Sequence, residues 1–304
     1  MNKELRQAIA DHGLSAIADR LCKDHKQTII ATPSEKEATI GSSKLGGIPH
    51  LPPNLKWPVE GEEHFLFIGQ INFAEVPQTI KEAPKSGWLY FFIGLDEPAY
   101  DVVHEVLYFS GDTSELAPVS PPTAQSINPD YGNTFPEVTL DFELAVTLPD
   151  YTFDESFDDY CDDLDELRQH MLESGGSRLF GHPEQWSGNP ALDAHLCTNG
   201  FKSIIFDTHK TMEEAQERVK STYASGDVDR IEYVDKWFEQ LKKYIETKDL
   251  HSKEAENWQV LFQVSSVDEC KMCWWDAGLL TYLIDTRNLE KTDFSRTYAC
   301  IQTS

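Results

Sequence analysis

The clearest pattern along the chain is an alternation of apolar and polar residues over 137–148. Every second position from Val138 to Leu148 is apolar, and the positions between them are polar or small. Successive side chains of a strand point to opposite faces, so this pattern predicts a strand with one buried and one solvated face. Strands of this kind are typical of antiparallel sheets.

Shorter runs of aromatic and β-branched residues, bounded by Gly, Pro and Asp, predict the other strands. Three of these runs lie in the first half of the chain and three near its end: 64–73, 87–95, 103–110, 258–264, 278–285 and 296–302. Apolar residues at helical spacing predict helices at the N-terminus, around 154–173 and around 211–247. The sequence therefore predicts an α+β fold with largely antiparallel sheets.

The most regular helical pattern covers 227–247. Its apolar residues recur at intervals of three, four, three and four: Ile231, Val234, Phe238, Leu241 and Ile245. Thr211 and Glu214 have the spacing of a capping box, which predicts that another helix begins there. The region 174–200 is rich in Gly, Pro, Ser and Asn, so we expect a loop.

Two groups of predicted strands resemble each other. Aligning HFLFIGQINF with NWQVLFQVSS pairs Gln70 with Gln263, and GWLYFFIG then aligns with GLLTYLID at nearly the same spacing. Upstream, SKLGGIP (43–49) resembles SRLFGHP (177–183). The shared order predicts an internal duplication, although any two buried hairpins share apolar alternation and a Gly turn.

The duplication hypothesis sets the expected domain organisation. We expect one domain over 1–304, made of two β-rich halves at about 26–150 and about 175–304. A helical segment over 1–25 precedes them. The two helices expected within 211–247 account for the greater length of the second half.

The charge of the chain restricts its partners. With 52 acidic and 26 basic residues, the formal net charge is -26. Such a surface repels phosphate backbones and anionic membranes, so we expect neither nucleic acid nor membrane as a partner. A basic protein is compatible with this charge, and a small molecule is not excluded by it.

The N-terminus lacks the apolar stretch of a signal peptide, and no window has the roughly 18 apolar residues of a membrane helix. Six cysteines in a chain without a secretory signal are typical of free thiols in a reducing compartment. We therefore expect a cytoplasmic protein.

Three clusters invite a chemical role, and each has a structural explanation that we prefer. The acids of 158–163 fit the Asp-Asp-x-x-Asp pattern of a magnesium site, but also an exposed helix face. Cys270 and Cys273 have the spacing of a zinc or redox pair but lack a second pair or a following helix. The three remaining candidates in the predicted loop match no metal motif: His182, His195 and Cys197. We expect no cofactor and find no catalytic motif.

The most unusual polar residues are Gln70 and Gln263, which lie in otherwise apolar strands. A buried amide must find partners or it lowers the stability of the fold. Either each amide holds a neighbouring loop, or the two face a pocket between the halves. Trp57, Trp275 and Asp276 flank the same elements and are candidate walls of that pocket.

Several segments together resemble the YwqG family, bacterial proteins also named DUF1963. They are KLGGIPHLPPNLKWP, FLFIGQINFAEV, GWLYFF, NWQVLFQV and WWDAGLLTYLI, and the resemblance covers about residues 40 to 302. It implies an α+β fold with an internal duplication and no established reaction. The family pattern Trp-Gly-Asp-x-Gly lacks its glycine here, because Trp275 directly precedes Asp276.

Two functional hypotheses follow. The first is a non-catalytic binding or immunity-type module that engages another protein, which the acidic charge and the family context favour. The alternative is an enzyme or a small-ligand-binding protein with a pocket between the two halves. A closed, filled groove at that junction argues against the alternative, and an open pocket with convergent polar groups favours it.

Overall fold

The computed structural model describes residues 2–94, 100–123, 126–127, 132–151, 154–172, 176–186 and 188–303. It divides into a sheet unit, Met1–Gly188 with Gln259–Ser304, and a helical unit, Asn189–Trp258. The described residues leave out the last residue of the predicted strand 87–95 and of the predicted helix 154–173. They also leave out residues 174, 175 and 187 of the predicted loop.

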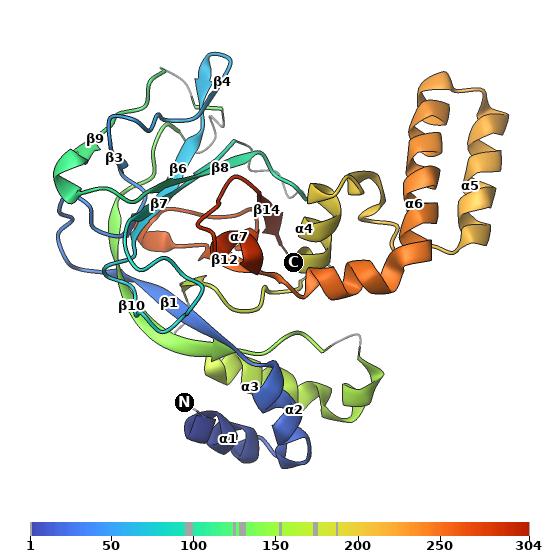
Figure 1. The fold of residues 1–304 in the computed structure, drawn as a ribbon, viewed down its shortest axis with the longest axis horizontal. Coiled ribbons are helices and arrows are strands. Elements are labelled where there is room, and N and C mark those ends of the chain that lie inside the picture. Colours follow the sequence, from blue (N-terminus) through green and yellow to red (C-terminus); the bar gives the residue numbers. More distant parts are fainter. Residues whose placement is uncertain are drawn as a thin grey trace. The chain divides into compact units, whose positions relative to one another are not determined.

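The mixed fold predicted from the sequence is confirmed, with a ten-stranded antiparallel sheet at its centre (Figure 1). Its order is β14-β13-β12-β11-β1-β10-β2-β6-β7-β8. The strands before residue 150 are β1 (Lys26–Ser34), β2 (Lys44–Leu45), β6 (Leu66–Asn72), β7 (Trp88–Ile93), β8 (His104–Phe109) and β10 (Val138–Thr147). Those after it are β11 (Ser177–Leu179), β12 (Trp258–Ser265), β13 (Leu279–Asp285) and β14 (Thr297–Gln302).

The two central strands, β1 and β10, pair along their whole length, from Lys26 opposite Thr147 to Ser34 opposite Thr139. The alternation over 137–148 correctly predicts the strand β10, whereas the patterns above do not single out β1. The predicted burial of one face is only partly right, because Leu144 is exposed and Thr139 is buried. At the sheet's two edges, Tyr100 bridges Cys300 and the Val102 N–H donates to the Ala299 carbonyl at 2.9 Å. The sheet therefore nearly closes on itself.

Short elements decorate the sheet. Two small antiparallel pairs join β3 (His50–Leu51) to β9 (Ala117–Pro118) and β4 (Val59–Glu60) to β5 (Glu63–His64). Three short helices cover Thr113–Glu115 (η2), Asp268–Cys270 (η6) and Thr286–Leu289 (α7).

The helices before β1 and after β10 form a second core in the sheet unit. They are α1 (Asn2–Asp11), η1 (Ser15–Ile17), α2 (Ala18–Asp24), η4 (Glu155–Tyr160) and α3 (Cys161–Met171). Figure 1 shows α1, α2 and α3 gathered near the same end of β1 and β10. Leu5, Leu21, Phe157 and Leu167 are among the buried residues that hold them together, as the apolar stripe predicted around 154–173 implies.

The helical unit contains α4 (Pro190–Thr198), η5 (Lys202–Ile204), α5 (Met212–Ser225) and α6 (Val228–Ala255). Helices α5 and α6 form an antiparallel hairpin (Figure 1). The capping box at Thr211 is present and begins α5. The predicted helix over 227–247 ends where α6 is kinked, because Thr247 leaves the helical conformation and its Oγ1 donates to the Lys243 carbonyl at 2.7 Å.

The prediction that 174–200 is a loop is wrong for two segments. It contains β11 and α4, and the start of α4 is marked by Asn189, whose side chain accepts hydrogen bonds from Ala191 and Leu192. Pro190 follows at the first helical position, where it loses no intrahelical hydrogen bond. The Asn-Pro pair is therefore a helix-start signal that the Gly- and Ser-rich composition concealed.

Candidate functional site

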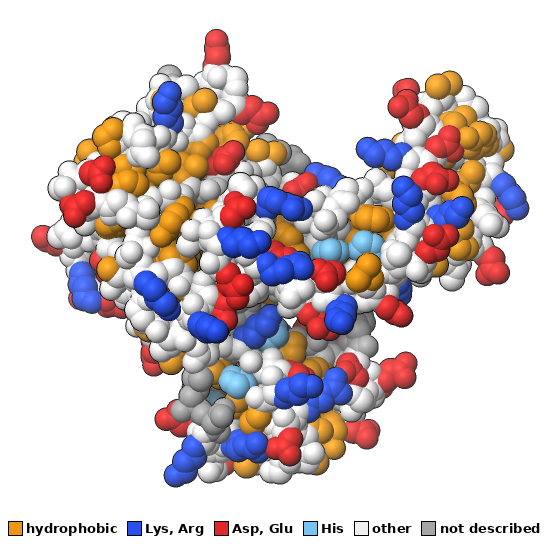
Figure 2. All heavy atoms as spheres, viewed as in Figure 1, with side chains coloured by type: hydrophobic (Ala, Val, Ile, Leu, Met, Phe, Trp, Pro, Cys, Tyr) orange, Lys and Arg blue, Asp and Glu red, His pale blue; other side chains and the backbone are white. Residues whose placement is uncertain are grey.

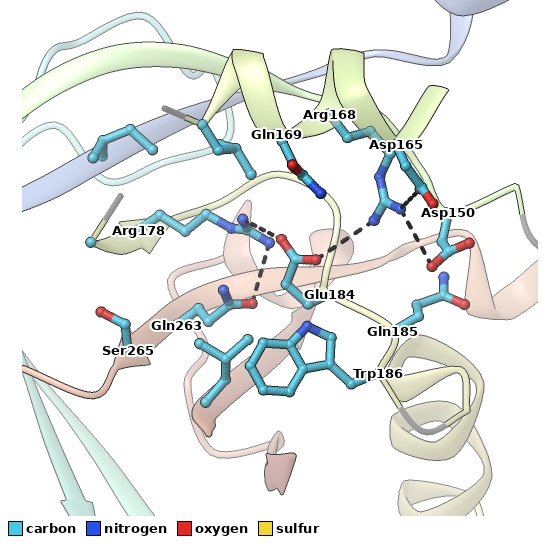
Figure 3. Close-up of a pocket in the computed structure, with 14 residues that line it drawn as sticks. Asp150, Asp165, Arg168, Gln169, Arg178, Glu184, Gln185, Trp186, Gln263 and Ser265 are labelled. Carbon is cyan, nitrogen blue, oxygen red and sulfur yellow. Dashed lines mark hydrogen bonds and ion pairs between the residues drawn. The ribbon is translucent and has the colours of Figure 1, made fainter. Parts of the chain in front are cut away.

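An open cavity of about 540 Å³ lies within the sheet unit, between α3, the segment after β11 and β12. We call it the Gln263 pocket. Figure 3 shows the polar side chains that converge on it. It is lined by Ile30, Asp150, Asp165, Arg168, Gln169, Leu172, Gly176, Arg178, Glu184, Gln185, Trp186, Gln263, Ser265 and Leu279.

Arg178, on β11, is the most deeply buried cation of the pocket, with its side chain 5% exposed. One terminal nitrogen donates to Glu184 Oε1 at 2.9 Å. The other donates to the His182 carbonyl at 3.0 Å and to Gln263 Oε1 at 3.2 Å. Burial lowers the pKa of Arg178, and the adjacent Glu184 opposes that effect.

Glu184 connects Arg178 to a second arginine, Arg168 of α3. Figure 3 shows the two guanidinium groups on either side of the Glu184 carboxylate. Arg168 lies 3.6 Å from Glu184 and 3.6 Å from Asp150, and donates to Asp165 at 3.4 Å. These separations exceed the roughly 3.2 Å limit of a good N–H···O bond, so the donors of Arg168 are incompletely used.

The amide of Gln263 has a defined orientation. Its Oε1 faces Arg178, and a guanidinium has no acceptor, so the oxygen must be the atom on that side. Its Nε2 has no hydrogen-bond partner among the described residues. Gln263 is only 3% exposed, yet it lines the cavity. Gln263 thus presents to the cavity a donor that has no acceptor among the described residues.

The turn after β11 places Glu184 over Arg178. Phe180 and Gly181 have φ values of 63° and 86°, a left-handed conformation that reverses the chain. A Cβ on Gly181 would lie 2.6 Å from Thr147 Oγ1, so only glycine fits. His182 then donates its N–H to the same Oγ1 at 2.9 Å, and burial lowers the pKa of its imidazole to about 3.

Gln70, on β6, lies in a different environment. Its Oε1 accepts from the His50 N–H and its Nε2 donates to the Ser42 carbonyl, both at 2.8 Å. Nearby, the buried Lys44 ammonium donates to the Ile48 carbonyl at 2.8 Å and to Glu137 at 2.5 Å. We call these residues the Gln70 cluster. Here the amide holds the backbone of the two neighbouring loops.

Of the five candidate residues from the sequence, only Gln263 lines the pocket. Trp57 is buried, packs against Phe92 and donates its indole N–H to the Phe65 carbonyl at 2.7 Å. Trp275 is 54% exposed, and its neighbour Asp276 is exposed as well. The structure brings neither tryptophan next to Gln263, and a binding role for either residue stays a prediction.

The turn that holds Trp275 fits the family pattern Trp-Gly-Asp-x-Gly once Trp274 is taken as its first residue. Trp275 then stands in the place of the glycine, and its φ of 54° is the left-handed conformation that glycine favours. Ala277 has a φ of 57°. At the position where the family pattern has glycine, Trp275 therefore adopts the backbone conformation that glycine favours.

The other candidate clusters remain apart from the pocket. Asp158, Asp159, Asp162 and Asp163 are exposed on η4 and α3. Cys270 is buried and Cys273 exposed, and burial raises the pKa of Cys270 to about 11. Over the described residues, no three His, Cys, Asp or Glu side chains are arranged to hold a metal ion.

His195 lies in the helical unit, where its Nε2 is 2.9 Å from His251 Nδ1. The adjacent Asp193 is buried, which raises the pKa of its carboxyl to about 7. Cys197 is half-buried on the same helix, α4.

Sequence reasoning missed Arg168, Arg178, Glu184 and Trp186. One signal for Arg178 was present, because SRLFGHP places an arginine where SKLGGIP has Lys44. No pattern showed that Arg168 of α3 reaches the same carboxylate, since that contact depends on how α3 packs.

Comparison with protein families identifies the chain. Its residues 43–302 match the family model described as a domain of unknown function, DUF1963. The chain belongs to the DUF1963 family. Comparison with curated proteins gives no match. The DUF1963 match covers every strand that contributes to the pocket except β1, and the bacterial source implied by the resemblance stays a prediction.

Within the described part of the DUF1963 chain, none of the helices combines the length and apolar character needed to cross a membrane.

Proposed function

We propose that the protein binds a small polar ligand in the Gln263 pocket. The observation that carries this proposal is the Nε2 of Gln263, a donor that lines an open cavity and has no acceptor among the described residues. A ligand acceptor placed in the cavity would give this donor a hydrogen bond, which contributes about 0.5–1.5 kcal/mol to binding. A volume of about 540 Å³ lies in the range typical of small-molecule sites.

The electrostatics of the pocket support the same proposal. The contacts from Asp150 through Arg168, Glu184 and Arg178 to Gln263 form a chain of preoriented donors and acceptors. Residues of this kind fix the orientation of a ligand, while Trp186 and Leu279 supply apolar walls.

A blocking variant tests the proposal. Ser265→Phe fills the pocket without removing any residue of the Arg178 network, and Ser114→Phe is the matched control in the exposed short helix η2. Thermal unfolding should be recorded with a panel of amino acids, nucleosides, organic acids, polyamines and sugars. We expect at least one compound to raise the Tm of the wild type and of Ser114→Phe but not of Ser265→Phe. No shift with any class would contradict the proposal.

The protein-binding role expected from the charge is the second candidate function. It is supported by the exposed acids of 158–163, which meet water on one face of η4 and α3. Figure 2, however, shows basic and acidic side chains interspersed over the face drawn, without one continuous acidic field there. Replacing Asp158, Asp159, Asp162 and Asp163 by Asn should abolish low-salt capture of a basic partner. If the variant still captures the basic partner at low salt, the result would argue against a charge-driven interface.

We also propose that the two halves of the sheet arose by duplication. This is supported by the cross-strand pairs, Lys44 opposite Gln70 and Arg178 opposite Gln263. Each of these cations donates to the carbonyl of the residue four positions further along, Ile48 in one half and His182 in the other. In other members of the family, the positions of Lys44 and Arg178 should both be basic, and unrelated residue types there would contradict the duplication.

A cytoplasmic location is the last part of the proposal. It is supported by the six cysteines, all of which lie among the described residues and none of which is in a disulfide. Thiol labelling of the protein taken directly from its cells should modify the exposed Cys161 and Cys273, whereas blocked thiols would indicate an oxidising compartment.

A further inference from the structure

We propose, building on the ligand-binding role above, that the Gln263 pocket takes an uncharged compound rich in hydroxyl groups, a saccharide. The inference rests on three features of the pocket. They are the alternation of its charges, its unused hydrogen-bond donors and the apolar ring at its rim.

The charges in the pocket alternate and nearly cancel. Arg178 and Arg168 are countered by Glu184 and Asp150, which are 21% and 10% exposed. Asp165 also contacts Arg168, but it is 67% exposed, so water screens it. A simple anion would be repelled by Glu184 and Asp150, and a simple cation would be repelled by the two arginines.

A hydroxyl group suits this alternation because it donates one hydrogen bond and accepts others. Between Arg168 and Glu184, which are 3.6 Å apart, a hydroxyl can accept from the guanidinium and donate to the carboxylate. The same holds between Arg168 and Asp150. Several hydroxyls on one ring therefore satisfy donors and acceptors that face each other across the pocket without adding charge.

The unused donors and acceptors of the pocket have the chemistry of hydroxyl partners. Gln263 Nε2 lines the cavity without an acceptor among the described residues, and its orientation is fixed by Arg178. The amides of Gln169 and Gln185 also line the pocket and have no side-chain hydrogen bond among the described residues. Each amide offers both a donor and an acceptor, as neighbouring sugar hydroxyls require.

Trp186 provides an apolar platform. Its side chain is 46% exposed, and Figure 3 shows its ring beside Glu184 and near Gln263. An exposed indole next to a polar network offers an apolar face that a ligand with an apolar side can cover. A sugar ring has an apolar face of C–H groups and a polar rim of hydroxyls, which matches this ring and the network next to it.

Saturation-transfer NMR and calorimetry test the inference. The probes are methyl glycosides of glucose, galactose, mannose and N-acetylglucosamine, with maltose and cellobiose. Citrate, spermidine and the dipeptide Ala-Gln are the anionic, cationic and zwitterionic comparisons. We expect saturable binding of at least one neutral sugar, with little dependence on sodium chloride because no net charge is neutralised.

Two variants locate the binding. Gln263→Leu and Trp186→Ala should each weaken the affinity roughly tenfold or more, and Ser114→Phe should not change it. Trp186 is exposed, so its replacement reports on binding even where Gln263→Leu lowers the yield of folded protein. Equal sugar affinity in wild type and Trp186→Ala would overturn the inference.

The outcomes separate the ligand class from the binding role. If a charged compound binds the wild type but not Ser265→Phe, and no neutral sugar does, the saccharide inference fails while the binding role stands. If no compound of any class binds, both fail. If a neutral sugar binds and Ser265→Phe abolishes the binding, both are supported.

Discussion

Gln70 and Gln263 occupy comparable places in the sheet, each next to a buried cation on the neighbouring strand, but their amides are used differently. Both polar ends of Gln70 are paired with loop backbone at 2.8 Å. Gln263 has its oxygen on Arg178 and its nitrogen free in a cavity. The surrounding segments thus pair both groups of one amide and leave the nitrogen of the other facing the cavity.

Lys44 and Arg178, the buried cations next to the two glutamines, also differ in how fully they are paired. In the Gln70 cluster, the Lys44 ammonium donates to the Ile48 carbonyl and to Glu137, and it lies 3.3 Å from His50 Nε2. Among the described residues, Glu137 is its one acidic partner. Arg178 shares Glu184 with a second guanidinium, that of Arg168. The region with two cations and one bridging carboxylate is therefore the one with groups available to a ligand.

The largest expected difference is between the two glutamines. Gln70→Leu leaves the His50 N–H and the Ser42 carbonyl unpaired, and we expect it to lower the free energy of unfolding by about 4 kcal/mol. Gln263→Leu should cost about 1 kcal/mol, because Arg178 still donates to the His182 carbonyl. Chemical denaturation measures both, and equal losses would indicate that Gln263 is structural.

The next largest difference in stability is expected between the acidic partners of the two buried cations, Glu184 and Glu137. Glu184→Gln removes the charge shared by two guanidinium groups, and we expect a loss of about 3 kcal/mol. Glu137→Gln removes the partner of one ammonium, and its side chain is 40% exposed, so we expect about 1 kcal/mol. The same denaturation experiment applies, and a larger loss for Glu137→Gln would reverse the contrast.

Acid should destabilise both regions to a similar degree. Burial lowers the pKa of His50 to about 4 and that of His182 to about 3, from an ordinary value of 6.5. Both imidazoles are neutral in the folded protein at pH 5, whereas in the unfolded chain they take up protons below about pH 6.5. The free energy of unfolding therefore decreases as the pH is lowered through that window. Each histidine should contribute about 2 kcal/mol of loss between pH 7.5 and 5.

Chemical denaturation of His182→Gln and of His50→Gln at pH 7.5 and at pH 5 checks this expectation. Each variant should show a loss smaller by about 2 kcal/mol than that of the wild type. An unchanged pH dependence in both variants would mean that other groups carry it.

The smallest effect concerns the turns that lead into β7 and β13. Gly87 precedes β7 with a φ of 93°, whereas Ala277 precedes β13 with a φ of 57°. Ala277→Gly relieves the left-handed strain and should raise the free energy of unfolding by about 0.5–1 kcal/mol. Gly87→Ala should destabilise, since a Cβ there lies 2.5 Å from the Phe109 carbonyl oxygen. Destabilisation by Ala277→Gly in a thermal melt would contradict this account of the turn.

Much of the fold follows from local patterns. The period of two gave β10, and the period of three and four gave α6 up to its kink at Thr247. The same reasoning selected Gln70 and Gln263, because an amide among apolar residues is visible without a structure. It could not separate them, since the partners of Gln70 are backbone atoms of distant loops.

The rest of the site depends on tertiary packing. Arg168 lies on a helix and Glu184 on an irregular segment, and no spacing in the sequence relates them. Trp57 was a reasonable candidate by position, yet its indole N–H is paired with the Phe65 carbonyl inside the core. Side chains at a site are recognised by what they leave unpaired, which only the structure reports.

Exchange of the two side-chain amides with solvent tests the central claim most directly. In one ¹H–¹⁵N NMR experiment on the ligand-free protein, the Nε2 hydrogens of Gln263 should exchange roughly tenfold or more faster than those of Gln70, which are held by the Ser42 carbonyl. Equal protection of the two amides, or slower exchange at Gln263, would contradict the account.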